Sequence, residues 1–305
     1  MVLVIGIDLG GTKIAGGLID AEGSLISRVL RPTDTASAEA VLDGLVAVAA
    51  DLQAEAPEAP VAVGVGVPGT LDRRRGRLIQ ASNLPLHDVA LVDALQERLG
   101  LPVAVDNDAN LAALAEHLHG AARRARHSLL LTLGTGVGGG VIIDDRVFRG
   151  ATGAGAELGH VSVERDGPPC PGGCPNHGCL EVYASGPGIG MVARRLGLPD
   201  PEPRSVNDRA LAGDGDALAV LQEVGRTLGV ALASFANVFD PEMIVLGGGV
   251  SAHVGHLLLP VAVAELRARA LRPNADQVEV VLAELGAEAG LIGAGDLARL
   301  EATRC

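Results

Sequence analysis

A strand, a glycine-rich turn and a second strand occur twice in this chain, at a constant offset. In residues 3–20 an apolar run leads into Asp8-Leu9-Gly10, and a second apolar run ends at Leu18-Ile19-Asp20. Residues 129–144 repeat the layout, with Thr132-Leu133-Gly134 and Ile142-Ile143-Asp144 at the matching positions. Each copy predicts a β-hairpin, and the shared offset predicts a duplicated unit. Chance similarity of two glycine-rich hairpins is the alternative.

Strand-like and helix-like segments alternate along the rest of the chain, which predicts an α/β protein. A chain of 305 residues favours two domains, each with its own core. We expect residues 1–117 with 289–305 to form a small N-terminal α/β lobe, and residues 118–288 a larger C-terminal lobe. Helices are expected at residues 38–53, 91–99, from 107, 217–239, from about 251 and 287–300, and strands at 61–69, 103–105 and 243–246. Residues 199–216 form a polar stretch rich in proline and aspartate.

Composition narrows the class of protein. Hydrophobic residues make up 48% of the chain and charged residues 20%, which is typical of a soluble, folded protein. A net charge of −13 argues against nucleic acid as a partner. The N-terminus lacks the basic region of a signal peptide, and we expect no apolar run of membrane-spanning length. The sequence therefore predicts a cytoplasmic protein with no membrane association.

The first glycine turn combines an acid with glycines, a hydroxyl and the chain's only lysine, in the run Asp8-Leu9-Gly10-Gly11-Thr12-Lys13. Glycine backbone N–H groups can approach a phosphate closely, and Thr12 can hydrogen-bond to it. Asp8, at a strand end, is placed to hold Mg²⁺. The sequence therefore predicts a phosphate site here, with a simple tight hairpin as the alternative.

The second glycine turn formally satisfies the G-x-G-x-x-G dinucleotide pattern through Gly134, Gly136 and Gly139. The residues after it predict a strand, whereas that pattern requires a helix, so we interpret it as a second phosphate turn carrying Thr135. We expect it to face the first turn across a cleft between the lobes. A third cluster, residues 247–249, lies between a strand and a helix; it suits either the nucleoside side of a nucleotide or an ordinary strand-to-helix turn.

Asn107 and Asp108 stand where a predicted strand passes into a helix. Open α/β sheets bind ligands at the carboxyl ends of such strands. A carboxylate there can accept the proton of an attacking hydroxyl, so Asp108 is the candidate base. The alternative is that Asp108 caps the helix.

One imidazole and three thiols, from His160, Cys170, Cys174 and Cys179, supply a complete tetrahedral set for structural zinc. Free thiols are the alternative. Glu157 and Glu181 lie on either side of this set in the sequence, so zinc binding would fix two carboxylates beside His160. Carboxylates and an imidazole are the groups that a hydroxyl-rich ligand needs.

These motifs together resemble the ROK family of repressors, open reading frames and sugar kinases, across essentially the whole chain. DLGGTK resembles the family's first phosphate motif, LGTGVGGG its second and LGGGV its nucleotide-side turn; GAELGH, the cysteine loop and GCLE are similar to the ROK signature. The resemblance implies a two-lobed, actin-like and hexokinase-type (ribonuclease H-like) ATPase fold with a duplicated βββαβα unit.

The resemblance also implies roles for individual residues. Asp108 is expected to be the catalytic base. The expected sugar-binding residues are Asn83, Asn107, Asp108, Glu157, His160 and Glu181. The expected nucleotide-binding residues are Asp8, Gly10, Gly11, Thr12, Lys13, Gly134, Thr135, Gly136, Gly138 and Gly248. The expected zinc ligands are His160, Cys170, Cys174 and Cys179, although three residues separate Cys170 from Cys174 where the family usually has one.

The implied activity is ATP-dependent phosphorylation of a hexose, with glucose converted to glucose 6-phosphate, ATP and Mg²⁺ as cofactors and structural Zn²⁺. N-acetylmannosamine, mannose and fructose kinases of the same family are alternatives. A sugar-responsive transcription regulator lacking its DNA-binding module is a different class, and an inactive sugar-binding protein a third. The first turn begins at residue 8, so we expect no helix-turn-helix ahead of it. The resemblance also implies a homodimer or homotetramer.

Overall fold

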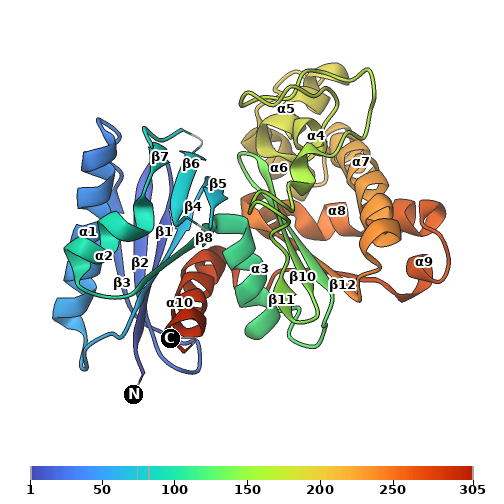
Figure 1. Cartoon of the computed structure of the whole chain (residues 1–305). Coiled ribbons are helices and arrows are strands. Elements are labelled where there is room, and N and C mark those ends of the chain that lie inside the picture. The colour runs from blue at the N-terminus through green and yellow to red at the C-terminus, as the bar shows by residue number, and fades with distance from the viewer. Residues whose placement is uncertain (1, 74, 82, 304–305) are drawn as a thin grey trace. The chain divides into compact units, whose positions relative to one another are not determined.

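The computed structural model describes residues 2–73, 75–81 and 83–303, which leaves Cys305 outside the described residues. The chain divides into two units, each containing one large sheet (Figure 1). The first holds the chain up to His119, the segment Val147–Ala156 and the chain from Glu288 onward. The second holds Gly120–Arg146 and Glu157–Ala287. The segment Val147–Ala156, expected in the second lobe, therefore groups with the first unit.

The first unit is built on a five-stranded mixed sheet. In spatial order its strands are β3 (Leu25–Pro32), β2 (Lys13–Ile19), β1 (Val4–Leu9), β4 (Val63–Val67) and β8 (Val103–Asn107). β1 and β4 read as nearly continuous apolar runs because both of their faces are covered, which is typical of parallel strands. β3, β2 and β1 pair antiparallel, and β1, β4 and β8 pair parallel.

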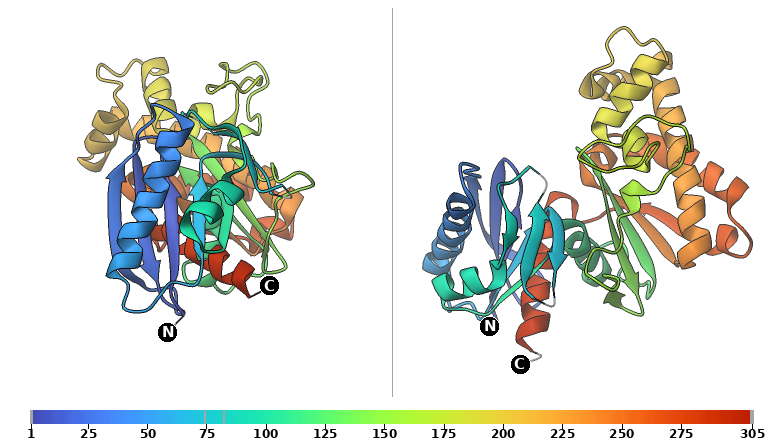
Figure 2. Two further views of the ribbon diagram at one scale, coloured as in Figure 1. Left: turned by 60° about the vertical axis from the view of Figure 1, so that its left-hand side comes forward. Right: turned by 45° about the horizontal axis from the view of Figure 1, so that its top comes forward.

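Helices cover both faces of this sheet, as Figure 2 shows for α1 (Ala38–Glu55) and α10 (Ala289–Ala302). Alternate side chains of β1 explain the two layers, because neighbouring residues on a strand point to opposite faces. Ile5 clusters with Leu45 of α1, whereas Val4 clusters with Ala298 of α10. The helices α2 (Leu91–Leu99) and α3 (Asp108–Leu118) belong to the α1 side and the α10 side, respectively.

A small antiparallel sheet follows β4 and was not predicted. It consists of β5 (Gly69–Asp72), β6 (Arg77–Ala81) and β7 (His87–Val89). Leu78 of β6 is fully buried in the cluster that includes β1 and α1. The strands are short and carry few apolar residues, so the sequence pattern gave no signal for them.

The second unit repeats the strand order of the first. Its sheet runs β11 (Arg146–Val147), β10 (Val137–Ile143), β9 (Ser128–Leu133), β12 (Met243–Gly247) and β13 (Glu279–Leu282). β9 and β10 pair antiparallel, and β9, β12 and β13 pair parallel, as their counterparts do. The common order and directions confirm the duplication.

The two hairpins differ in one detail of their pairing. Leu9 pairs with Ile14 across a turn formed by residues 10–13, whereas Leu133 pairs with Val137 across residues 134–136. The second turn is therefore one residue shorter, and the pairing of its return strand is shifted by one residue relative to the sequence alignment.

Helices fill most of the remainder of the second unit. The polar stretch at residues 199–216 contains a helix, α6 (Pro203–Leu211), whose Pro203 occupies the first turn and whose Val206 and Ala210 are buried. This helix was not predicted because only one narrow face of α6 is apolar. The helices are α4 (Leu180–Ala184), α5 (Gly186–Arg195), α6 (Pro203–Leu211), α7 (Gly215–Phe239), α8 (Gly248–Arg269) and α9 (Asn274–Gln277), with a short 3-10 turn, η1 (Leu158–His160).

Two helices, α7 and α8, are long and apolar enough to cross a membrane by length and composition, with mean hydropathies of 1.2 and 1.4 over 18 residues. The expectation that no such run exists was therefore wrong. The two helices pack on each other, and Leu228, Leu232, Leu258 and Ala262 are fully buried. This packing is that of core helices in a globular unit.

Candidate functional site

The carboxyl ends of the three parallel strands of the first unit bring the expected acids to one edge of the sheet. Asp8 of β1 pairs with Gly66 of β4, and Gly66 pairs with Asp106 of β8. Two strand spacings of about 4.8 Å place the backbones of Asp8 and Asp106 about 10 Å apart. Asn107 and Asp108 follow Asp106 directly, so they lie at the same edge as Asp8.

The first glycine turn is held by backbone contacts and by one residue that sequence reasoning missed. Gly10 N–H donates to the Lys13 carbonyl at 2.9 Å. The Thr33 hydroxyl donates to the Gly10 carbonyl at 2.7 Å, and its N–H donates to the Thr12 carbonyl at 3.0 Å. The side chains of Thr12 and Lys13 are exposed, as a ligand-binding turn requires. Nothing in the sequence near Thr33 indicated this contact.

Asn83 lies beside the first glycine turn. A Cβ atom added at Gly11 would lie 3.6 Å from the Asn83 Cβ. The Asn83 backbone has a φ of 61°, a left-handed conformation that asparagine tolerates better than most residues. The expected sugar-binding asparagine and the expected phosphate turn are thus neighbours in the first unit.

Asp8 is largely buried at the beginning of α10. A Cβ added at Gly290 would lie 3.3 Å from the Asp8 carboxyl carbon, so the first turn of α10 covers this acid. Burial raises the pKa of Asp8 and the charge of Lys13 opposes the shift. A buried carboxylate that is costly to ionise is a site where a cation would bind with advantage.

An Asp8→Asn variant is expected to unfold at a higher temperature than the unaltered chain at pH 7. Because the pKa of Asp8 is raised on folding, stability falls as pH rises from its unfolded pKa to its folded pKa. Asparagine does not ionise, so the variant avoids this loss of stability. The increase in unfolding temperature should vanish near pH 3, where Asp8 is protonated in both the folded and the unfolded chain. Thermal unfolding in a chelator at both pH values measures the effect.

The control for this variant is Asp51→Asn, which alters an exposed acid paired with Arg31 at 2.6 Å. We expect no gain in Tm from that change at pH 7. A lower Tm for Asp8→Asn than for the unaltered chain at pH 7 would contradict the prediction.

Asn107, and not Asp108, occupies the N-cap position of α3. Its side-chain oxygen accepts hydrogen bonds from the N–H groups of Ala109 at 2.9 Å and Asn110 at 3.2 Å. Its amide nitrogen donates to the Gly69 carbonyl at 3.3 Å. Asp108 is the first helical residue, and its Oδ1 accepts from Ala109 N–H at 2.8 Å. The capping alternative was therefore assigned to the wrong residue.

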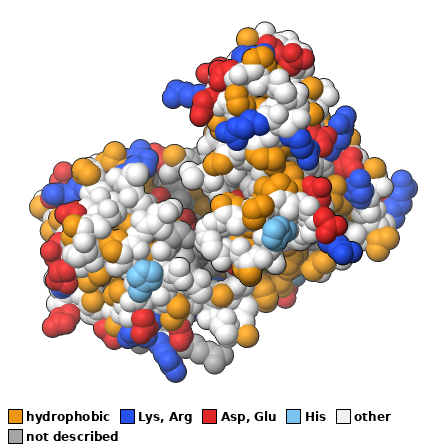
Figure 3. Space-filling view, turned by 90° about the horizontal axis from the view of Figure 1, so that it is seen from above, with side chains coloured by type: hydrophobic (Ala, Val, Ile, Leu, Met, Phe, Trp, Pro, Cys, Tyr) orange, Lys and Arg blue, Asp and Glu red, His pale blue; other side chains and the backbone are white. Residues whose placement is uncertain are grey.

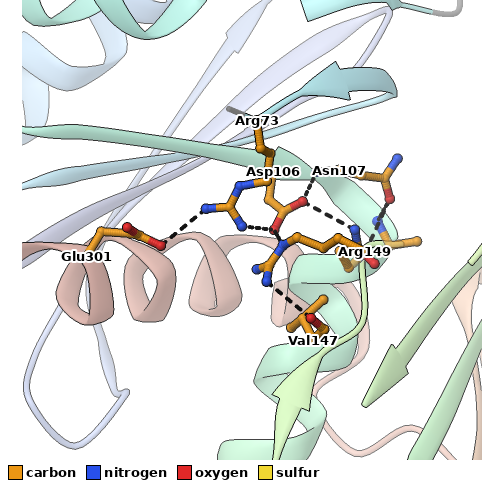
Figure 4. Close-up of polar contacts among 8 residues, drawn as sticks. Arg73, Asp106, Asn107, Val147, Arg149 and Glu301 are labelled. Carbon is orange, nitrogen blue, oxygen red and sulfur yellow. Dashed lines mark hydrogen bonds and ion pairs between the residues drawn. The ribbon is translucent and has the colours of Figure 1, made fainter. Parts of the chain in front are cut away.

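A buried ion-pair network stands directly before Asn107 and was missed by sequence reasoning (Figure 4). Asp106 has a 1% exposed fraction and pairs with Arg149 at 2.6 Å and Arg73 at 3.2 Å. Arg73 also pairs with Glu301 of α10 at 3.2 Å. An acid at the last buried position of a strand was the one sequence signal for such a network.

In the second unit, both ends of the second glycine turn are tied to α4 and α5. Gly134 N–H donates to the Gly136 carbonyl at 2.9 Å, and the Gly134 carbonyl accepts from Gly186 N–H at 2.7 Å. Glu181 accepts from Val137 N–H at 2.8 Å. A Cβ at position 136 would lie 2.5 Å from the Glu181 carboxylate, so glycine permits this approach. Thr135, at the tip, is exposed.

The third glycine cluster lies against the second turn. Gly248 begins α8 with a φ of +83°, and a Cβ there would lie 2.4 Å from the Leu133 carbonyl oxygen. Leu133 immediately precedes Gly134. Only glycine fits this position, and the N-terminus of α8 is thereby placed next to the expected phosphate turn, a favourable setting for an anion. The helix begins three positions earlier than expected.

The expected metal ligands converge within the second unit. One ligand atom from each of His160, Cys170, Cys174 and Cys179 lies within 4.8 Å of the other three. His160 Nδ1 lies 3.4 Å from Cys170 Sγ. Zinc bonds of about 2.3 Å to sulfur and 2.0–2.1 Å to nitrogen would separate tetrahedral neighbours by about 3.5–3.8 Å. The donor set therefore fits zinc, and Cys174 reaches it despite the longer spacing.

The cysteine loop is connected to the second turn through α4. Cys179 occupies the N-cap position of this helix, and Glu181 lies in its first turn. On the other side, η1 carries His160, and the His160 N–H donates to the Glu157 carbonyl at 3.1 Å. The side chain of Glu157 is exposed. His160, Glu181 and the second turn are thus parts of one local framework.

The expected site residues divide between the units. The first unit holds Asp8, Gly10, Gly11, Thr12, Lys13, Asn83, Asn107 and Asp108. The second unit holds Gly134, Thr135, Gly136, Gly138, Gly248, Glu157, His160, Glu181, Cys170, Cys174 and Cys179.

Comparison with known proteins identifies relatives over the whole chain. The glucokinase of Streptomyces coelicolor is 38% identical, over 98% of this chain and 98% of its own length. The crystal structure of a ROK hexokinase from Thermus thermophilus is 39% identical, with a TM-score of 0.86 over 99% of this chain and 100% of that chain. A ROK family glucokinase from Streptomyces griseus, solved in complex with glucose and AMPPNP, is 36% identical, with a TM-score of 0.84 over 98% and 99% of the two chains.

The sequence profile of the ROK family matches residues 4–301. This range includes both hairpins, the strand edge with Asp8 and Asp108, and the cluster of His160 with three cysteines. Together with relatives that share more than a third of their residues over nearly full length, it establishes the fold as the actin-like, hexokinase-type fold. The chain belongs to the ROK family.

Proposed function

We propose that this chain is an ATP-dependent glucokinase that converts glucose to glucose 6-phosphate. The observation that carries the proposal is the edge of the first sheet, where Asp8 lies at the end of β1 and Asp108 follows β8, the two parallel strands on either side of β4. The near full-length similarity to glucokinases, one of them solved with glucose and an ATP analogue, supports the substrates.

In the proposed reaction, the 6-hydroxyl oxygen of glucose attacks the γ-phosphorus of ATP. A bond forms between these two atoms while the bond from phosphorus to the β,γ-bridging oxygen breaks, and ADP leaves. Asp108 accepts the hydroxyl proton. Because the transition state of phosphoryl transfer is loose, the position of Asp108 matters more than its basicity.

Two glycine turns and one acid form the core of the proposed nucleotide site. Asp8 would hold Mg²⁺, which neutralises charge on the phosphoryl oxygens when bound. Backbone N–H groups of the turns would contact phosphate. The nucleotide residues proposed are Asp8, Gly10, Gly11, Thr12, Lys13, Gly134, Thr135, Gly136, Gly138 and Gly248.

The sugar would be held by polar side chains, because the chain has an aromatic content of 1%. His160 directs Nδ1 toward Cys170, so its Nε2 is the atom placed for a sugar hydroxyl. The sugar-binding residues proposed are Asn83, Asn107, Asp108, Glu157, His160 and Glu181.

His160, Cys170, Cys174 and Cys179 would hold structural Zn²⁺. Burial raises the pKa of the Cys170 and Cys179 thiols, and a divalent cation would stabilise their thiolate forms. Four protein ligands leave no open position for water or substrate, so the proposed role is to fix the loop.

The proposal includes a cytoplasmic location, a homodimeric or homotetrameric assembly and no nucleic-acid or membrane partner. Net charge is −13. On the face in Figure 3, the positive side chains (blue) are scattered among acidic ones (red). A surface that binds phosphodiester backbones has its positive side chains clustered in a patch.

A coupled ADP-release assay tests the proposed substrate. Glucose, mannose, fructose, N-acetylglucosamine and N-acetylmannosamine are compared at saturating Mg·ATP, and we expect the highest kcat/KM for glucose. A site that hydrogen-bonds each hydroxyl should reject epimers by about 10-fold or more. A higher kcat/KM for another hexose would reassign the substrate, and no ADP release with any sugar would refute the kinase. Specific retention of DNA in a gel shift would favour the regulator class.

A further inference from the structure

From the buried network before α3, we infer that Arg149 is a positioning residue for phosphoryl transfer, holding the segment that leads to Glu157 against the strand that leads to Asp108. The inference rests on the proposed function, because it assigns these two acids to the sugar site. It adds a residue outside the sets proposed above.

The Asp106 carboxylate uses its two oxygens for two different tasks (Figure 4). Oδ1 accepts from the backbone N–H of Asn107 at 2.8 Å and from the side-chain amide of Asn110 at 3.2 Å. These contacts fix the strand-to-helix junction from which Asp108 projects. Oδ2 accepts from Arg149 Nε at 2.6 Å and Arg73 at 3.2 Å. Each arginine therefore acts on the junction through one shared carboxylate.

Arg149 also organises its own segment, Val147–Ala156. Its guanidinium donates to the Val147 carbonyl at 3.2 Å, and its own carbonyl accepts from Gly155 N–H at 3.0 Å. The segment thus folds back on Arg149 just before Glu157 and η1. Val147–Ala156 groups with the first unit and Glu157 begins the second, so Arg149 anchors the first-unit segment that is joined in sequence to Glu157.

The environment of Arg149 makes the loss of this contact costly. Its side chain has an exposed fraction of 24%, and the Asp106 side chain is almost fully buried. Burial lowers the pKa of Arg149, and the charge of Asp106 opposes that shift. Ion pairs removed from water are screened little by salt, and loss of one partner leaves the other charge buried.

Arg73 provides a matched control. It binds the same Asp106 oxygen, but its second contact is Glu301 of α10 and not the segment before Glu157. Its exposed fraction, 22%, is close to that of Arg149. Arg73→Gln therefore removes one charge from Asp106 and leaves the Arg149 contact in place.

The experiment compares Arg149→Gln with Arg73→Gln in glucose and ATP kinetics. We expect Arg149→Gln to lower kcat/KM for glucose by about 10- to 100-fold, since displacement of a positioned group by about 1 Å has this cost. We expect KM for ATP to change by less than about threefold, because none of the proposed nucleotide-binding residues belongs to this network. Arg73→Gln should keep kcat/KM for glucose within about threefold of the unaltered enzyme.

Thermal unfolding of both variants separates positioning from stability, and Arg149→Lys keeps the inference testable if Arg149→Gln fails to fold. The lysine variant should recover part of kcat/KM, because it retains the charge at Asp106 but not the second donor to Val147. Equal losses of kcat/KM in both glutamine variants would overturn the inference, as would unchanged glucose kinetics in Arg149→Gln. If the unaltered enzyme phosphorylates no hexose, the proposed function fails. That result is distinct from the two results that would overturn the role of Arg149.

Discussion

An Asp108→Ala variant is expected to lose turnover, with kcat lowered by about 10²–10⁴-fold, the usual contribution of a general base. The effect should fall on kcat, while KM for ATP stays near its original value, because the nucleotide turns do not include this residue. Since Asn107 is the N-cap of α3, the helix keeps both hydrogen bonds of its cap. Steady-state kinetics with glucose, together with circular dichroism and zinc content, measure the prediction.

Asp93→Ala is the matched control for that variant. Asp93 is also an acid in the first turn of a helix of the first unit, but it lies in α2. Both changes remove one charge that favours a helix N-terminus, an effect of about 0.3–1 kcal/mol on stability. We expect Asp93→Ala to retain kcat. A retained kcat in Asp108→Ala would remove Asp108 from the role of base.

Loss of the proposed zinc should also lower catalytic efficiency strongly. We expect about one zinc per chain in the purified protein, and its removal by a chelator should lower kcat/KM for glucose by at least about tenfold. Without the metal, the loop loses the cluster that positions Cys179 at the beginning of α4, and Glu181 then no longer holds Val137 N–H at 2.8 Å. KM for ATP should therefore rise together with KM for glucose.

Cys179→Ser gives the same test without a chelator, and Cys305→Ser is its control because Cys305 is the one cysteine outside the proposed set. Metal analysis should show zinc lost in the first variant and kept in the second. Hydrogen exchange should become faster around residues 157–185 when zinc is lost. Full zinc occupancy and unchanged kinetics in Cys179→Ser would show that this thiol is not a ligand.

The sequence by itself determined the elements that depend on local pattern. Two apolar runs around a glycine turn predicted each hairpin, and the topology of the two sheets confirms the duplicated unit. The helix at Leu91–Leu99 was predicted with its correct bounds, and α1 to within two residues of its end. These features follow from periodicity and turn chemistry, which act over a few residues.

Elements with a weak or narrow apolar pattern were not predicted, because prediction depended on local periodicity. The strands β5, β6 and β7 are short, and α6 presents a narrow apolar face, so neither gave a clear period. The starts of α7 and α8 were also placed two and three residues too late, because the glycines in their first turns carry no apolar signal.

Only the tertiary structure decided which side chains act on one another. Strand pairing places Asp8 and Asp106 in one row across the sheet. Asn107 is the N-cap residue of α3, and Arg149 pairs with Asp106 from a segment distant in the sequence. Glu181 likewise meets Val137 only because the cysteine loop returns to the second turn. Such contacts join residues far apart in the chain, and their energy depends on burial and geometry that no local pattern encodes.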